Sequence, residues 1–134
     1  MPRQRVRLTH AERVLRLLER QQRPLTAYEI LEALRGDGVA AATTVYRALA
    51  KLLKTGYVHR IESLNAWTAC CEPHHSETPV FRICDDCGNV TEHVAPHIAR
   101  DIAAMSADSG FVPDRSVIEI HGRCSDCSPT VPIT

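Results

Sequence analysis

Two pairs of cysteines constrain this chain more than any other feature. Each pair has a two-residue gap, Cys84 with Cys87 and Cys124 with Cys127, and thirty-six residues lie between the pairs. A two-residue gap on a tight turn directs both thiolates at one ion, and two such turns complete a tetrahedral four-cysteine zinc site. The long spacer means that the ion would join the ends of a segment large enough for a helix and strands. The pairs therefore predict a zinc ion that contributes to folding.

Two other kinds of chemistry use CxxC motifs. A redox-active CxxC opens a helix in a βαβ setting and occurs singly. A zinc deaminase carries proline directly before CxxC, but Ile83 precedes Cys84 and Arg123 precedes Cys124. The sequence has no Ser-His-Asp pattern, P-loop or glycine-rich nucleotide fingerprint. We therefore expect no enzyme and no small-molecule substrate, and keep a zinc enzyme or CxxC redox protein as the remote alternative.

Length and composition limit the remaining choices. A chain of 134 residues forms one large domain or two small ones. No apolar run approaches the roughly eighteen residues of a membrane span, and the basic N-terminal residues have no apolar stretch behind them, so we expect a cytoplasmic protein without a membrane partner. Six cysteines without a secretion signal favour metal binding over disulfides.

The charges are divided between two parts of the chain. Residues 1–60 contain twelve Lys or Arg against five Asp or Glu, which gives +7, whereas residues 61–134 contain four against eleven, which gives −7. Such an asymmetry, hidden behind a net charge of zero, suggests a nucleic-acid-binding part and a second part with another role. We therefore expect double-stranded DNA as a partner of the N-terminal part.

Three helices are predicted in that basic part. Capping boxes at Thr9 and Thr26 begin the first two, and the first spans about residues 9–22. The third spans about 43–55, with Gly56 as a terminator. Its buried side is expected to consist of Val45, Leu49, Leu52 and Leu53.

A hairpin is predicted after the third helix, from the β-rich segments Tyr57–Glu62 and Ala66–Cys71. Three helices followed by a hairpin predict a winged helix-turn-helix. The outer side of the third helix carries a basic stripe with two neighbours, and these residues are predicted to contact DNA: Thr44, Tyr46, Arg47, Lys51 and Lys54. The alternative for such a stripe is a solvated helix face.

The remaining residues predict a small second module, which makes the whole chain α+β. Strands are expected at Val80–Ile83, Asn89–Val94 and Ser116–His121, with a helix at about 96–108. The predicted domains are a winged helix at 1–71, a hinge linker at 72–79, and a metal-binding domain at 80–134.

A second group of potential metal ligands is spread along the chain. His59 and Cys70 are expected on opposite strands near the base of the hairpin, the His74-His75 pair lies in the linker, and Glu92 lies in the second module. A metal bound by all of them would fix the angle between the two modules and so control DNA affinity. The alternative is that they are unrelated surface or core residues.

Motifs along nearly the whole chain resemble those of a known family. They are Arg7-Leu8-Thr9, Thr44-Val45-Tyr46-Arg47-Ala48-Leu49, Gly56-Tyr57-Val58-His59, Glu62-Ser63, Phe81-Arg82-Ile83-Cys84-Asp85-Asp86-Cys87-Gly88 and His121-Gly122-x-Cys124-x-x-Cys127. Together they resemble the ferric uptake regulator superfamily, and within it the zinc-responsive branch.

The resemblance implies a homodimeric bacterial repressor with an N-terminal winged helix, a hinge and a C-terminal dimerisation domain. It implies that the four paired cysteines hold a structural zinc. Its regulatory zinc ligands, transferred position by position, fall on His59, Cys70, a histidine of the His74-His75 pair taken as His75, and Glu92. A DNA-contacting tyrosine in the second helix and an arginine in the recognition helix correspond to Tyr28 and Arg47.

Cys70 distinguishes between the metals that the family senses. Iron-sensing sites in the family rely on imidazole and carboxylate, whereas a thiolate is a soft ligand that favours zinc. We therefore expect a zinc-responsive repressor of zinc uptake genes that binds palindromic operator DNA, with two zinc ions per chain, one structural and one regulatory. The alternative within the family is a regulator that responds to iron or another metal.

Overall fold

The computed structural model describes residues 7–21, 23–70, 78–114 and 116–128. By its internal contacts the chain divides into two compact units, residues 1–74 and 75–134. The predicted hinge, residues 72–79, lies mostly outside the described residues, so the domain boundaries stay a prediction. None of the described helices is both long and apolar enough to cross a membrane.

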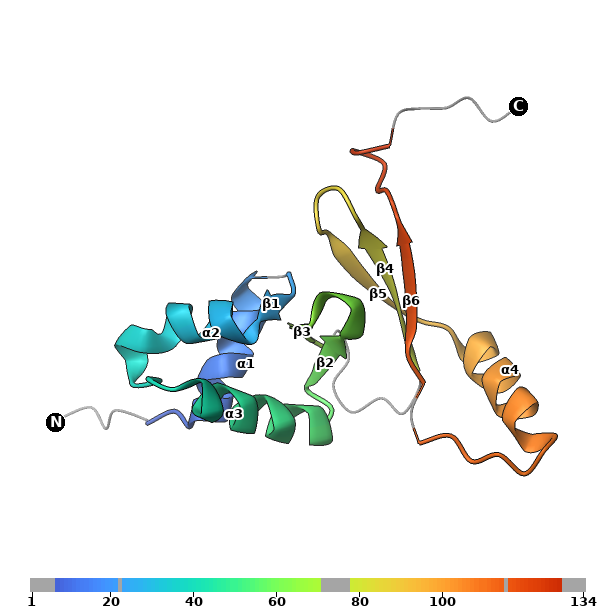
Figure 1. Ribbon diagram of the computed structural model, residues 1–134, viewed down its shortest axis with the longest axis horizontal. Coiled ribbons are helices and arrows are strands. Elements are labelled where there is room, and N and C mark those ends of the chain that lie inside the picture. Colours follow the sequence, from blue (N-terminus) through green and yellow to red (C-terminus); the bar gives the residue numbers. More distant parts are fainter. Residues whose placement is uncertain (1–6, 22, 71–77, 115, 129–134) are drawn as a thin grey trace, which may run out of the picture. The chain divides into compact units, whose positions relative to one another are not determined.

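The N-terminal unit consists of three helices and a small antiparallel sheet (Figure 1). Its elements are α1 (His10–Gln21), β1 (Leu25–Thr26), α2 (Ala27–Leu34), the 3-10 turn η1 (Arg35–Asp37), α3 (Ala42–Lys54), β2 (Val58–Ile61), the 3-10 turn η2 (Glu62–Leu64) and β3 (Ala66–Ala69). The sheet order is β1-β3-β2, so the two-residue β1 pairs with the hairpin. The predicted winged helix-turn-helix is confirmed.

The capping boxes form as the sequence predicts. The Thr9 side chain accepts a hydrogen bond from the Glu12 backbone N–H, and the Glu12 carboxylate accepts one from Thr9 N–H, each at 3.1 Å. Thr26 and Glu29 repeat the arrangement at the start of α2. These reciprocal bonds satisfy backbone N–H groups that a helix start leaves unpaired, which is why both helices begin close to the predicted residues.

The core of this unit is aliphatic, with one tryptophan. The residues of α3 that it buries are Val45, Ala48, Leu49 and Leu52. The prediction that Leu53 lies on the buried side is wrong, because its side chain is 39% exposed. At about 100° per residue, Leu53 projects roughly 90° from the centre of that stripe, and Ala48 occupies the opposite margin.

The C-terminal unit is a three-stranded sheet with one helix (Figure 1). Its elements are β4 (Pro79–Cys84), β5 (Val90–Val94), α4 (Pro96–Ala107) and β6 (Ile118–Gly122). The strand order is β5-β4-β6, antiparallel between β4 and β5 and parallel between β4 and β6. Because the parallel pairing sets Cys84 opposite Gly122, the segments that follow both strands begin at the same edge of the sheet.

Candidate metal centres and nucleic-acid interface

The structure brings the four paired cysteines together at that edge. Cys84 is the last residue of β4 and Cys87 lies in the turn after it, while Cys124 and Cys127 follow β6. Their four Sγ atoms lie within 4.8 Å of one another, and the Sγ atoms of Cys87 and Cys124 are 3.8 Å apart. All four thiols are free of disulfides. This arrangement suits one tetrahedral ion coordinated by sulfur.

Backbone hydrogen bonds shape both cysteine turns. In the first, Gly88 N–H donates to the Cys84 carbonyl at 2.9 Å, and Gly88 has a φ of +77°. A glycine is favoured there because a side chain is strained at positive φ. In the second, the N–H groups of Cys127 and Ser128 both donate to the Cys124 carbonyl, at 3.1 and 2.8 Å. Each turn thus directs its two thiols to one side.

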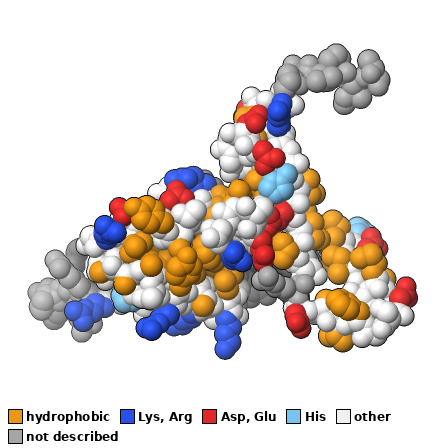
Figure 2. Space-filling model, in the orientation of Figure 1, with side chains coloured by type: hydrophobic (Ala, Val, Ile, Leu, Met, Phe, Trp, Pro, Cys, Tyr) orange, Lys and Arg blue, Asp and Glu red, His pale blue; other side chains and the backbone are white. Residues whose placement is uncertain are grey.

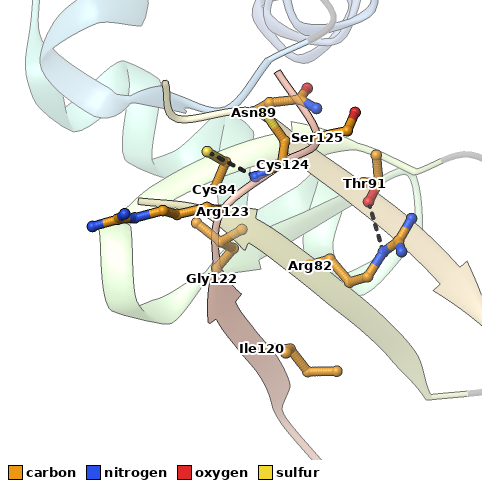
Figure 3. Close-up of a pocket in the computed structure, with 10 residues that line it drawn as sticks. Arg82, Cys84, Asn89, Thr91, Ile120, Gly122, Arg123, Cys124 and Ser125 are labelled. Carbon is orange, nitrogen blue, oxygen red and sulfur yellow. Dashed lines mark hydrogen bonds between the residues drawn. The ribbon is translucent and has the colours of Figure 1, made fainter. Parts of the chain in front are cut away.

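The electrostatics of the cluster fit a divalent cation. Backbone N–H groups of Cys87 and Cys124 lower the pKa of the Cys84 thiol to about 6, and the Cys124 N–H lies 3.3 Å from the Cys84 Sγ (Figure 3). The side chains of Cys124 and Cys84 raise the pKa of Cys127 to about 12. The site therefore stabilises one thiolate but opposes further negative charge, and a bound zinc ion would offset that repulsion.

Polar pairs that the sequence analysis did not predict join the two cysteine turns. His121 Nδ1 lies 2.8 Å from the Asp85 carboxylate, and the Arg123 guanidinium lies 3.4 Å from that of Asp86. Asp85 N–H also donates to the Gly122 carbonyl at 2.9 Å. The sequence contains a signal for these pairs. Two acidic residues lie inside the first CxxC, and a histidine and an arginine precede the second.

A pocket of about 470 Å³ adjoins the cluster (Figure 3). Arg82 and Thr91 lie on its wall from the neighbouring strands β4 and β5, and Arg82 Nε donates to the Thr91 hydroxyl at 3.4 Å. Cys84 and Cys124 line its other end.

Part of the second predicted metal site also forms. His59 lies on β2 and Cys70 directly follows β3, and His59 Nε2 is 3.1 Å from Cys70 Sγ. The hairpin register explains this proximity, because His59 pairs with Thr68 and Cys70 N–H donates to the Tyr57 carbonyl at 2.8 Å. The pair offers one nitrogen and one sulfur donor.

The other two predicted ligands lie outside the hairpin. Glu92 lies on β5 of the C-terminal unit, where it pairs with Phe81 and is half-buried. His74 and His75 lie outside the described residues. The membership of Glu92 and His75 in this site stays a prediction.

The predicted DNA-contacting residues lie on α2 and α3. Tyr28 is 69% exposed and Tyr46 is 51% exposed, so neither ring is simply a core residue. Arg47, Lys51 and Lys54 are exposed, whereas Thr44 is half-buried. Figure 2 shows Lys and Arg side chains along the side of this unit that carries α3. The basic stripe is therefore accessible to a nucleic acid.

Comparison with known proteins decides the family. A model of the ferric uptake regulator family matches residues 3–132. This chain belongs to the ferric uptake regulator family. The zinc uptake regulation protein of Escherichia coli (strain K12) is 40% identical over 127 residues, which cover 91% of this chain and 73% of the relative. Because members of the family are transcription regulators, the alternatives of a zinc enzyme and a redox protein are excluded.

Solved structures agree with this assignment. A zinc uptake regulator complexed with zinc and DNA superposes with a TM-score of 0.84 at 39% identity, covering 90% of this chain and 83% of that one. The crystal structure of holo XcZur gives 0.81 at 35% identity, covering 89% and 84%. A ferric uptake regulator from Francisella tularensis with iron, at 19% identity and a TM-score of 0.60, covers 95% and 97% and shares the fold.

Proposed function

We propose that this chain is a cytoplasmic, zinc-responsive transcriptional repressor. It binds palindromic operator DNA when zinc occupies a regulatory site, and it controls zinc uptake genes. The observation that carries this proposal is the similarity, over nine-tenths of the chain, to a zinc uptake regulator complexed with zinc and DNA. The 40% identity to the Escherichia coli zinc uptake regulation protein also supports it.

The donor atoms favour zinc over iron. The His59–Cys70 pair supplies an imidazole and a thiolate, and sulfur is a ligand that zinc prefers. The ferric uptake regulation protein of Campylobacter jejuni is only 28% identical, over 108 residues. An iron regulator is therefore the less favoured alternative.

Two zinc ions per chain are proposed, with different roles. The four-cysteine cluster would hold the structural ion, which contributes folding energy to a unit with a small core. His59, Cys70, His75 and Glu92 would hold the regulatory ion with nitrogen, sulfur and oxygen donors. Four protein ligands leave no open position, which suits regulation rather than catalysis.

Recognition of DNA is proposed to divide between two kinds of contact. Arg47 lies on the exposed side of α3, where a recognition helix contacts base edges in the major groove. Lys51 and Lys54 follow on the same helix and would contact phosphates, which supply affinity without sequence preference. Tyr28, on α2, is the proposed tyrosine contact.

A homodimer is proposed because no other element of the described C-terminal unit covers α4. None of its residues is buried, and Figure 1 shows it to one side of the sheet rather than across its face. The described part of this unit also exposes five large apolar side chains, which are Met105, Phe111, Val112, Val117 and Ile120. A second copy of the chain would cover them and present two recognition helices to the two half-sites of a palindrome.

Metal analysis combined with DNA binding tests this function. Protein purified without chelator should contain two zinc ions per chain, and a mild chelator should remove one of them. The chelated protein should lose binding to a duplex selected from a random library by the zinc-loaded protein, and added zinc should restore binding. Restoration by ferrous iron and not by zinc would contradict the proposal.

A further inference from the structure

One aromatic cluster joins the hairpin to the recognition helix within the N-terminal unit. Trp67 lies on β3 and Tyr46 on α3, and their ring centroids are 6.0 Å apart with planes at 75°, an edge-to-face contact. Arg60 pairs with Trp67 across the strands β2 and β3, and its Cζ lies 5.8 Å from the centroid of the indole. The Trp67 ring therefore contacts side chains of both the helix α3 and the strand β2.

Burial gives the three side chains different roles. Trp67 is only 4% exposed, so the core fixes its ring, whereas Tyr46 is half exposed on the face of α3. Arg60 is held further by a 2.8 Å hydrogen bond to the Asn65 side chain and a 3.7 Å ion pair with Glu62. Among the described residues, no acceptor pairs with the Trp67 Nε1, so the polar contacts of this side chain are its ring interactions with Tyr46 and Arg60.

The cluster lies next to the proposed regulatory site. The neighbouring cross-strand pair of the hairpin joins His59 of β2 to Thr68 of β3. His59 Nε2 is also 3.1 Å from Cys70 Sγ. His59 and Arg60 are consecutive residues of β2, so their side chains point to opposite faces of the strand and are linked through its backbone.

We propose that Trp67 is a positioning residue that couples the His59–Cys70 site to the recognition helix by holding Tyr46 and Arg60 in place. This proposal rests on the proposed function, since it concerns zinc-dependent DNA binding. Trp67 needs no contact with DNA or metal for this role. It sets the orientation of Tyr46, on the recognition helix α3, relative to the β2–β3 hairpin.

A double-mutant cycle tests the contact. Trp67→Leu should weaken binding of the zinc-loaded protein to the selected duplex by about 3- to 10-fold, the range expected for one aromatic contact. Binding to a shuffled duplex of the same composition should change less. Adding Trp67→Leu to Tyr46→Leu should cost less affinity than Trp67→Leu costs alone, because Tyr46→Leu has already removed one of the two contacts of Trp67. Trp67→Phe keeps an aromatic ring and should restore most of the affinity.

A matched control separates positioning from stability. Val58→Ala removes a buried side chain of the same hairpin without removing any ring of the cluster. It should lower the melting temperature as Trp67→Leu does, yet retain the preference for the selected duplex. Loss of that preference in both variants would assign the effect to stability and overturn the role of Trp67.

Fluorescence gives a direct readout, because Trp67 is the only tryptophan in the chain. Chelated wild-type protein should change its emission when zinc is added, and Cys70→Ser should not. An unchanged emission in a wild-type protein that gains DNA binding on zinc addition would overturn the coupling alone. A wild-type protein whose DNA binding ignores zinc would overturn the proposed function and, with it, the coupling.

Discussion

The N-terminal unit packs fifteen buried residues into one cluster, whereas the described part of the C-terminal unit buries only Val80, Phe81, Ile83 and Cys84. Burial of apolar surface is the dominant favourable contribution to folding, so this cluster is the main source of stability of the first unit. The second has a four-thiol cluster and an uncovered helix instead. We therefore propose that the N-terminal unit is stabilised by its side-chain packing, whereas the C-terminal unit depends on a metal ion and a partner copy.

The largest expected effect concerns the four-cysteine cluster. Cys84→Ser or Cys124→Ser should lose the structural zinc and should unfold or monomerise the C-terminal unit, because the ion contributes folding energy there. The N-terminal helices should remain folded. Zinc content, size-exclusion chromatography and circular dichroism measure these three outcomes. A stable dimer with unchanged zinc content in either variant would contradict the difference between the units.

The matching change in the aliphatic core is Leu49→Ala. Leu49 is 1% exposed on α3, so the truncation should lower the free energy of unfolding of the N-terminal unit by about 2–5 kcal/mol. Chemical denaturation measures it. The structural zinc should stay bound in this variant, and its loss would show that the two units do not have separate sources of stability.

A smaller effect is expected at the recognition helix. Arg47→Ala should weaken binding to the selected duplex by about 1–3 kcal/mol and relax the base preference at one position. Lys54→Ala should weaken binding to selected and shuffled duplexes alike, as loss of a phosphate contact does. Competition assays with both duplexes separate the two. An equal loss on both duplexes for Arg47→Ala would remove that residue from base recognition.

The smallest change is Tyr28→Phe. This variant removes only the hydroxyl of a side chain that is 69% exposed, so the fold should be unaffected. If the hydroxyl contacts DNA, affinity should fall by about the 0.5–1.5 kcal/mol of one hydrogen bond. Titrations at several salt concentrations measure it. Unchanged affinity at all of them would leave Tyr28 without a DNA contact through its hydroxyl.

The fold was largely predictable because its determinants are local. The capping boxes at Thr9 and Thr26 set the helix starts, and the hairpin register brought His59 opposite the strand that leads to Cys70. The prediction that Leu53 is buried is wrong because adjacent leucines cannot both lie at the centre of a helical stripe. The two-residue β1 gave no pattern, since strand alternation needs more residues.

The candidate site was predictable only in part. The spacing of the cysteines predicted their cluster, because each pair is a local turn and β4 pairs with β6. The contacts of Trp67 with Tyr46 and Arg60 depend on how α3 packs against the hairpin, which no local pattern encodes. The positions of Glu92 and His75 relative to His59 and Cys70 depend on the arrangement of the two units. Their assignment as metal ligands therefore rests on the family resemblance.

We propose that zinc at the His59–Cys70 site controls DNA binding while the four-cysteine cluster maintains the fold. Titrating zinc into Cys70→Ser, with the selected duplex in a gel-shift assay, tests it most directly. We expect this variant to keep one zinc per chain, the fold and the dimer, yet not to gain DNA binding as zinc is added. A zinc response equal to that of the wild-type protein would contradict this role of Cys70, because the thiol would then not be a ligand of the regulatory metal.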